Sequence, residues 1–199
     1  MKKEERTIIY FIRHGTIKNK NPQVIPGDYD FTMSSKGKSE IKKVANWLSK
    51  KDISAIYSSP IKRALESAEI IQKKFLSLRI NKSFEIREWI RPWRGKFYKN
   101  VIKAREWQIY LNNPTKLTGY QDLKGLSNRM LNFLKKLLKK HSSKEIVCVT
   151  HQDPIRALRL RLERKPLDLL NKIHCKNGSV TILYFNGNKL NKIRYIEPK

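Results

Sequence analysis

The sequence lacks any long apolar run. The apolar run near its start, Thr7–Ile12, has six residues, whereas a membrane-spanning helix needs roughly 20. It leads directly into Arg13 and is too short for the apolar core of a secretory leader. The chain has only two cysteines, Cys148 and Cys175, which do not form a Cys-x-x-Cys motif. We therefore expect a cytoplasmic protein with no membrane contact.

Several signatures of cofactor chemistry are also missing. The chain contains no Walker phosphate-binding loop, no dinucleotide-binding glycine motif and no Gly-x-Ser-x-Gly nucleophile motif. His174 and Cys175 are neighbours, but they lack two further ligands at a spacing that suits zinc. We therefore predict a protein that uses neither a metal nor an organic cofactor.

Acidic residues are scarce. The chain has 44 lysines and arginines against 17 aspartates and glutamates, which gives a formal net charge of +27. Such an excess attracts anions and favours non-specific contact with nucleic acid. The lysines are scattered along the whole chain, mostly on the polar faces of predicted helices. Two interpretations stay open: a solvated lysine-rich surface, or a surface that contacts a polyanion or a bulky polyphosphate. The sequence leaves the oligomeric state open.

The chain does contain an alternation of apolar strands and amphipathic helices. We predict strands over 7–12, 53–57, 84–89 and 145–150, and helices over 35–50, 60–75, 97–111, 126–141 and from 154 onward. Caps at Ser34 or Ser35, Ser59 and Asp153 start three of these helices. An Asn-Gly turn predicts a hairpin of 179–185 with 190–196. The alternation predicts a three-layer α/β/α fold with a mostly parallel central sheet and an antiparallel edge strand. At 199 residues the chain suits a single domain.

Basic and imidazole side chains follow several of these strands. Arg13 and His14 come directly after the first strand, and His151 follows the strand of 145–150. Arg63 lies in the first turn of the helix after the second strand, where a cation is unfavourable unless an anion binds nearby. The carboxyl ends of parallel strands meet at one sheet edge. The four side chains therefore predict an anion site, and phosphate fits it best.

These motifs resemble those of the histidine phosphatase superfamily, also called phosphoglycerate mutase-like. The resemblance covers about residues 7–185. The motifs that carry it are, in chain order, Arg13-His14-Gly15, Phe31-Thr32-Met33-Ser34-Ser35-Lys36-Gly37, Ser58-Ser59-Pro60-Ile61-Lys62-Arg63-Ala64, Arg87-Glu88, Val149-Thr150-His151 and Gly178-Ser179-Val180-Thr181.

The resemblance implies a phosphoglycerate mutase-like fold and a metal-independent phosphatase that acts on a small phosphomonoester. His14 would attack phosphorus and form a phosphohistidine. Arg13, Arg63 and His151 would hold the phosphate oxygens. Glu88 would protonate the leaving alkoxide and then activate water. Further candidate phosphate-binding or substrate-binding residues are Asn19, Thr16 and Gln152. A helical or loop cap insertion over about 89–125 would set specificity.

Glu85 is the alternative acid. If residues 84–89 form a strand, the offset of three places Glu85 and Glu88 on opposite faces, so only one of them faces the site. The family position favours Glu88. The chain departs from the family pattern just after this acid, because the segment Pro92–Gly95 is one residue shorter than usual. This difference affects where the loop places Glu88.

Other functions on the same fold stay open. One is phosphoryl transfer of the phosphoglycerate mutase type, although the chain lacks the Arg-His-Gly-Glu-Ser start and the larger inserts of cofactor-dependent mutases. Another is removal of phosphate from protein phosphohistidine. A function of a different class is a basic nucleic-acid-binding protein with little turnover, which the charge of +27 favours. The sequence does not identify the physiological substrate.

Overall fold

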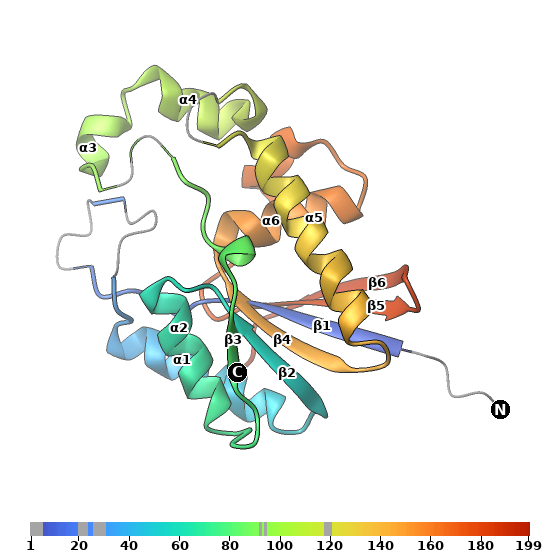
Figure 1. The fold of residues 1–199 in the computed structure, drawn as a ribbon. Helices are drawn as coiled ribbons and strands as arrows, with labels where there is room; N and C mark the ends of the chain where they lie inside the picture. The colour runs from blue at the N-terminus through green and yellow to red at the C-terminus, as the bar shows by residue number, and fades with distance from the viewer. Residues whose placement is uncertain (1–5, 20–23, 26–30, 92, 94, 118–120) are drawn as a thin grey trace.

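The computed structural model describes residues 6–19, 24–25, 31–91, 93, 95–117 and 121–199 (Figure 1). Within these residues six strands form one sheet in the order β3-β2-β4-β1-β5-β6. The strands are β1 (Arg6–Arg13), β2 (Ile53–Ser58), β3 (Ile80–Lys82), β4 (Glu145–Thr150), β5 (Val180–Asn186) and β6 (Lys189–Ile196). Strands β1 to β4 run parallel, and the β5–β6 hairpin joins β1 antiparallel. The predicted mostly parallel sheet with an antiparallel edge is confirmed.

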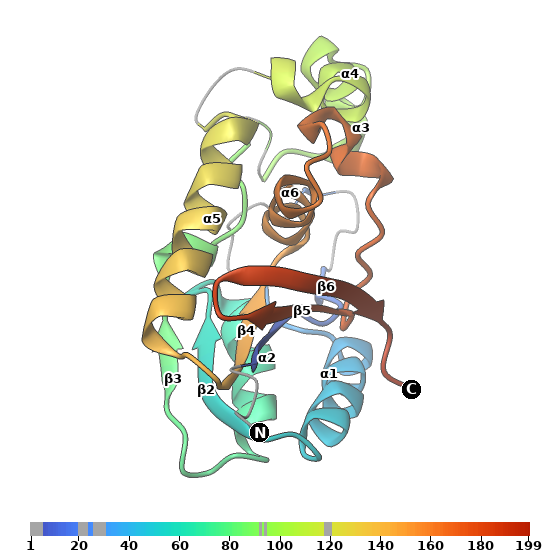
Figure 2. The same cartoon turned by 90° about the vertical axis from the view of Figure 1, so that its right-hand side faces the viewer.

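Helices cover both faces of this sheet. In Figures 1 and 2, α1 and α2 lie on one side of the sheet, and α5 and α6 lie on the other. The helices are α1 (Ser35–Leu48), α2 (Lys62–Gln72), α3 (Tyr98–Val101), α4 (Arg105–Asn112), α5 (Leu123–Lys140) and α6 (Gln152–Leu162), with the short 3-10 helices η1 (Phe84–Ile86), η2 (Pro114–Lys116) and η3 (Leu167–Lys172). The arrangement is the predicted three-layer α/β/α fold.

Strand β1 shows how the sequence builds two cores. Successive side chains of a strand point to opposite faces. Ile9 and Phe11 accordingly join the apolar core beneath α5 and α6. Tyr10 and Ile12 join the core beneath α1 and α2. Because β1 is buried on both faces, its carboxyl end brings Arg13 and His14 to a fixed place at the sheet edge.

The start of α1 follows the predicted cap. The Ser34 side chain accepts a hydrogen bond from the Gly37 backbone N–H at 3.1 Å, which satisfies one of the free donors of the first turn. Ile41, Val44 and Leu48 then form the buried stripe of the helix. The cap therefore fixes the first turn of α1 beside the loop that follows β1.

The other two predicted caps are wrong in detail. Helix α2 begins at Lys62, and Ile61 at its cap position makes no side-chain cap hydrogen bond. The Ser59 hydroxyl accepts a hydrogen bond from the Ile61 N–H at 3.3 Å, just before the helix, and lies 2.8 Å from Nε2 of His151. Helix α6 begins at Gln152, also without a side-chain cap. The Asp153 carboxylate, which we expected to cap it, pairs with arginines described below. Ser59 and Asp153 therefore both contact residues of the candidate site, and only Ser59 also bonds the backbone at the start of its helix.

The third predicted strand is also wrong. Residues 84–86 form η1, and the strand that pairs with β2 is β3, just before it. The side chain of Ser83 accepts a hydrogen bond from the Glu85 N–H at 3.3 Å and starts the turn. Ile86 and Trp89 are buried whereas Phe84 is 70% exposed. The apolar residues of this segment therefore do not alternate as a strand requires.

The predicted helix over 97–111 is broken into α3 and α4. The aromatic packing accounts for the break, because the rings of Tyr98 and Trp107 lie 5.2 Å apart. In one continuous helix, residues nine apart are separated by roughly 13 Å along the axis. The bend thus lets Tyr98 fold back onto Trp107.

Helix α5 also differs from its prediction, because it begins at Leu123 with Asp122 as its cap, earlier than the predicted start at 126. The segment from η1 to α5 corresponds to the predicted cap insertion of 89–125, of which residues 92, 94 and 118–120 lie outside the described residues. Its helices α3 and α4 lie at one end of the molecule, away from α1 and α2 (Figures 1 and 2). None of the helices in the described ranges combines the length and apolar character needed to cross a bilayer.

Candidate active site

The loop after β1 is held by backbone contacts. The His14 N–H donates to the Thr150 carbonyl at 3.0 Å, which extends the β1–β4 pairing by one residue. Asn177 donates from its side chain to the His14 carbonyl at 3.0 Å. A Cβ at Gly15 would lie 2.8 Å from the carbonyl carbon of Gly37, so the two backbones meet with no room for a side chain. Glycine is therefore required at both positions, and His14 sits on rigid backbone.

Both ring nitrogens of His14 have partners. Nε2 accepts a hydrogen bond from Nε of Arg63 at 3.0 Å. Because the guanidinium can only donate, Nε2 carries the lone pair. Nδ1 must then carry the proton, and it lies 2.8 Å from the Gly15 carbonyl. Burial, followed by the charges of Arg63 and Arg13, holds the pKa of His14 well below its ordinary value. His14 is therefore a neutral imidazole whose available lone pair is on Nε2.

Arg63 reaches the site from the first turn of α2 and is only 1% exposed. The carbonyl of Arg63 accepts a hydrogen bond from the Ser67 hydroxyl at 2.7 Å. Ser67 in turn accepts from the Gly15 N–H at 3.3 Å. Helix α2 and the His14 loop are thus joined through Ser67, which fixes Arg63 against the imidazole.

His151 follows β4 and is fully buried. Its ring centroid lies 5.1 Å from that of His14. Burial, then the charges of Arg63, His14, Arg13 and Arg129, hold its pKa well below its ordinary value. Nδ1 of His151 is buried and has no hydrogen-bond partner among the described residues, and the same holds for Nε of Arg13. A buried guanidinium N–H needs a partner, and the oxygens of a bound anion would supply one to Arg13 and, once Nδ1 is protonated, to His151.

Arg13 connects the site to the start of β5. Its guanidinium donates to the Cys175 carbonyl at 2.6 Å, and its charge lowers the pKa of both His14 and His151. Arg13, His14, Arg63 and His151 are therefore brought together as the sequence predicts. The structure adds that Arg13 lies at the border of the cluster.

Glu88 and Glu85 have different surroundings. Glu88 is 6% exposed, and its carboxylate accepts a hydrogen bond from the Trp89 N–H at 2.9 Å. Glu85 pairs with Lys136 at 2.9 Å on the surface. Burial, then the negative charge of Asp153, raise the pKa of Glu88, while Arg91 and Arg63 lower it. The two carboxylates lie in different surroundings, as expected. The reason is the 3-10 turn of η1 and not the alternation of side chains along a strand.

Arg129 of α5 holds the backbone just before Glu88. Its guanidinium donates to the carbonyls of Phe84, Glu85 and Arg87 at 3.3, 2.7 and 3.1 Å. The Thr150 hydroxyl donates to the neighbouring Ile86 carbonyl. Sequence analysis missed Arg129. Arg129 follows Leu126 by three residues and precedes Phe133 by four, so it lies at the edge of the apolar stripe of α5. The other cations of this helix are all lysines, and a single arginine among them is the signal that could have identified it.

Asp153 and Arg91 form a second contact that sequence analysis missed. Asp153 is 1% exposed and pairs with Arg91 at 3.2 Å and with Arg156 at 3.7 Å. The Arg91 guanidinium lies 5.0 Å from the Tyr110 ring centroid. Burial, then the charge of Asp153, raise the pKa of Tyr110 to about 12. The pair joins the segment after Glu88 to the first turn of α6.

The remaining candidate residues make contacts within the protein. Thr16 donates its backbone N–H and its hydroxyl to Glu40, both at 2.8 Å. Asn19 donates to the Val24 carbonyl at 3.0 Å. The side-chain oxygen of Gln152, once its amide is correctly oriented, accepts from Arg156 at 2.6 and 3.0 Å. Their roles as phosphate or substrate ligands stay predictions. Among the described residues, no group of three or more His, Cys, Asp or Glu side chains is placed to hold a metal ion.

The order of these motifs can be compared with known families. The sequence profile of the histidine phosphatase superfamily (branch 1) matches residues 9–197. The chain belongs to this superfamily. The match covers every strand except the start of β1 and extends past both candidate acids. The resemblance predicted from the motifs is confirmed.

Relatives in the histidine phosphatase superfamily agree with this assignment. Phosphoglycerate mutase-like protein 4 of Arabidopsis thaliana is 32% identical over 189 residues, which cover 91% of this chain and 81% of the relative. Phosphoserine phosphatase 1 of Hydrogenobacter thermophilus is 29% identical over 164 residues, covering 79% and 77%.

Solved structures show the same fold. YhfR of Bacillus stearothermophilus has a TM-score of 0.86 at 24% identity and covers 93% of this chain and 94% of its own. A phosphoserine phosphatase mutant of Entamoeba histolytica in complex with phosphoserine has a TM-score of 0.81 at 22% identity, covering 94% and 96%.

Proposed function

We propose that the protein hydrolyses small phosphomonoesters without a metal, through a phosphohistidine on His14 and with Glu88 as general acid and base. One observation carries the proposal. Nε2 of His14 carries the lone pair that accepts the hydrogen bond from Arg63, and the buried Nδ1 of His151 and Nε of Arg13 lack partners among the described residues. This arrangement offers a nucleophile and oxygen-binding groups to the same phosphoryl group.

The reaction has two balanced steps. In the first, Nε2 of His14 attacks phosphorus, the bond from phosphorus to the ester oxygen breaks, and Glu88 gives its proton to the leaving alkoxide. In the second, water attacks the phosphohistidine, Glu88 takes a proton from that water, and the bond from phosphorus to nitrogen breaks. Arg13, Arg63 and His151 stabilise the charge on the phosphoryl oxygens in both steps.

The pKa shifts support these roles. The lowered pKa of His14 keeps Nε2 unprotonated near neutral pH, as a nucleophile requires. The raised pKa of Glu88 favours the protonated acid that the first step needs. His151 is neutral in the absence of substrate, and a phosphate dianion beside it favours its protonation.

The names of relatives support a small phosphorylated substrate. One solved relative holds phosphoserine, and the phosphoserine phosphatase of the same organism is also described with 3-phosphoglyceric acid. Both compounds are small phosphomonoesters that carry a carboxylate. We therefore propose phosphomonoesters of this size as the first substrates to test.

The test compares phosphate release from O-phosphoserine and p-nitrophenyl phosphate, in the presence of EDTA, by the wild type, His14→Ala and His141→Gln. His141 lies in contact with Tyr57, outside the cluster, so His141→Gln is the matched histidine control. We expect His14→Ala to lose turnover by at least about a thousandfold and the control to keep it. Equal rates for wild type and His14→Ala would remove the nucleophile assignment.

The same assay identifies the acid. Glu88→Gln should lower kcat on O-phosphoserine about 10²-fold to 10⁴-fold, because its alkoxide leaving group needs a proton. The loss on p-nitrophenyl phosphate should be smaller, because nitrophenolate leaves without one. Glu85→Gln is the control and should change neither rate. Product analysis with 3-phosphoglycerate, with and without a bisphosphate, separates hydrolysis from mutase activity: 2-phosphoglycerate as the main product would replace the proposed hydrolysis.

A further inference from the structure

A cationic hollow adjoins the candidate active site. It has a volume of about 500 Å³, which lies within the range of small-molecule pockets. Its walls come from the end of β1, the first three turns of α1, the start of α6, the segment before β5 and the residues that follow β6. Figure 2 shows the C-terminal end of the chain beside α1, where the two close one side of the hollow. Of the cluster residues only Arg13 lines it, whereas His14, Arg63, Glu88 and His151 do not.

The hollow is positively charged. Five lysines and arginines line it against two glutamates, and one histidine, His174, also contributes; the lysines and arginines are Arg13, Lys36, Lys43, Arg156 and Lys176. Both glutamates are already engaged. Glu40 accepts hydrogen bonds from Thr16, and Glu197 pairs with Lys176 at 3.0 Å and with His174 at 3.3 Å.

Two of the three lysines in the hollow have no acidic partner within the described ranges. Lys36 and Lys43 form no ion pair with any of the residues that the structure describes. Lys36 also lies in the first turn of α1, at the positive end of the helix dipole, where a cation is unfavourable by itself. An anion bound between Lys36 and Lys43 would supply the missing negative charge to both lysines and would offset the unfavourable position of Lys36 at the helix dipole.

We propose that this hollow binds a compact anion with linked phosphoryl groups, at a site separate from the phosphate cluster around His14. Linked phosphoryl groups match the several cations spread over its walls, and Arg13 and Arg156 supply planar guanidinium groups for their oxygens. The anion can be a free polyphosphate or the distal phosphoryl group of a substrate held at His14. Arg13 borders both sites, so an occupant of the hollow competes for its guanidinium.

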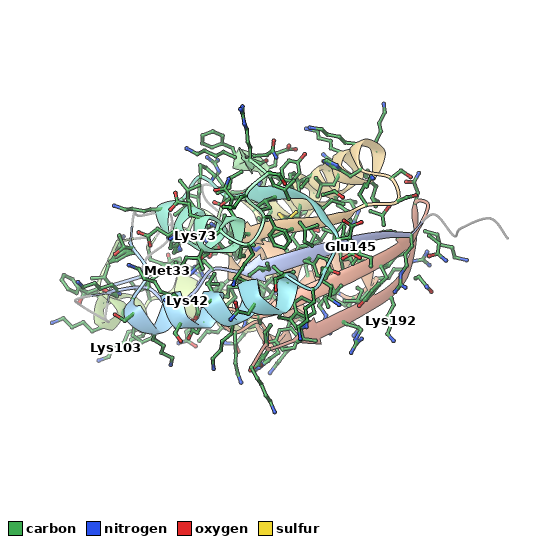
Figure 3. The ribbon with its side chains drawn as sticks, turned by 90° about the horizontal axis from the view of Figure 1, so that it is seen from below. Met33, Lys42, Lys73, Lys103, Glu145 and Lys192 are labelled. Carbon is green, nitrogen blue, oxygen red and sulfur yellow. The ribbon has the colours of Figure 1, made fainter. Side chains whose placement is uncertain are left out.

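The test measures binding of imidodiphosphate, whose bridging nitrogen resists hydrolysis, by titration calorimetry. The wild type should bind two molecules, one at each site. Lys36→Gln/Lys43→Gln should keep one site and weaken the other at least tenfold. Lys38→Gln/Lys42→Gln is the matched control, because it removes the same charge from the same helix outside the hollow; Lys42 is labelled on α1 in Figure 3. The control should bind like the wild type.

A third variant changes the affinity in the opposite direction. Glu197→Gln releases Lys176 and removes a negative charge from the wall, so it should tighten the second site several-fold. Arg63→Ala, by contrast, should remove the catalytic site and leave the hollow occupied. Equal binding by the Lys36/Lys43 variant and its control, or a single site that Arg63→Ala abolishes, would overturn the proposal. These binding results do not require turnover, so they stand apart from the proposed phosphatase activity.

Kinetics then distinguishes the two sources of the anion. If the distal group of a substrate reaches the hollow, Lys36→Gln/Lys43→Gln should raise KM for fructose 1,6-bisphosphate and leave KM for p-nitrophenyl phosphate unchanged. If the anion is separate, the variant should keep both KM values and lose only the inhibition by imidodiphosphate. Either pattern supports a second site. An unchanged response to all three compounds would contradict it.

Discussion

Two parts of the candidate active site are held in different ways. The phosphate cluster at the end of β1 is fixed by backbone: the sheet ladder continues into His14, and Gly15 meets Gly37 without intervening side chains. The loop that carries Glu88 is fixed by side chains instead, chiefly Arg129 and the Arg91–Asp153 pair. We therefore expect the first part to be most sensitive to a side chain added at the glycine contact, whereas the second can be released by a single side-chain substitution.

A substitution of Gly37 should disrupt the contact between the backbones of the His14 loop and α1. A Cβ at this position would lie 2.6 Å from the Thr16 nitrogen, so Gly37→Ala forces the His14 loop and α1 apart. We expect a loss of about 3 kcal/mol in the free energy of unfolding and loss of phosphatase activity, measured by urea denaturation and phosphate release. Gly125→Ala is the control, because its Cβ would approach the side chains of Asp122 and Gln121, just before α5, rather than the backbone of another element. A Gly37→Ala protein as stable as this control would refute the close approach.

A substitution of Arg129 should release the loop that carries Glu88 without unfolding the protein. Arg129→Ala leaves the carbonyls before Glu88 without their donor, so the acid loses its fixed position. We expect kcat on O-phosphoserine to fall about 10²-fold, with a smaller fall on p-nitrophenyl phosphate. Arg129→Lys should recover only part of the loss. Its ammonium group can still donate hydrogen bonds, but it lacks the planar guanidinium that reaches all three carbonyls. Lys136→Ala on the same helix is the control. Equal losses on both substrates would show a general structural defect instead.

We expect the smallest of the three effects from Asp153→Asn, which should shift the pH dependence of kcat. Glu88 faces Asp153 of α6, Arg63 of α2, Arg91 of its own loop and Arg129 of α5. Asp153 raises the pKa of Glu88, so Asp153→Asn lowers it, and Arg91 then acts on Glu88 alone. Because the first step needs protonated Glu88, the alkaline limb of kcat on O-phosphoserine should move to lower pH. Asp168→Asn, on the surface, is the control, and a limb that stays in place would exclude Asp153 from this role.

The same contrast explains what could be predicted from the sequence. The strand of 145–150, the Ser34 cap and the meeting of His14 with Arg63 and His151 follow from local patterns and from the parallel sheet, and each is found. The segments that were predicted wrongly are shaped by distant side chains. Residues 84–86 form a 3-10 turn whose carbonyls Arg129 holds. The helix of 97–111 is bent by the packing of Tyr98 on Trp107.

The distribution of positive charge also shows the difference between what local sequence patterns predict and what depends on the fold. The labelled lysines of Figure 3 come from α1, the end of α2, the turn between α3 and α4, and β6 (Lys42, Lys73, Lys103 and Lys192). Such a distribution fits the scattering predicted from the sequence. The spacing of charges along the chain does not reveal that a few of them converge on one hollow, because that convergence depends on how β1, α1, α6 and the segment before β5 meet.

The contact between Gly15 and Gly37 also has a mechanical consequence. Side chains at an interface can change rotamer and absorb a small displacement, but two backbones in direct contact cannot. The first turn of α1, where Lys36 lines the hollow, therefore cannot move toward the loop after β1 without displacing the backbone beside His14.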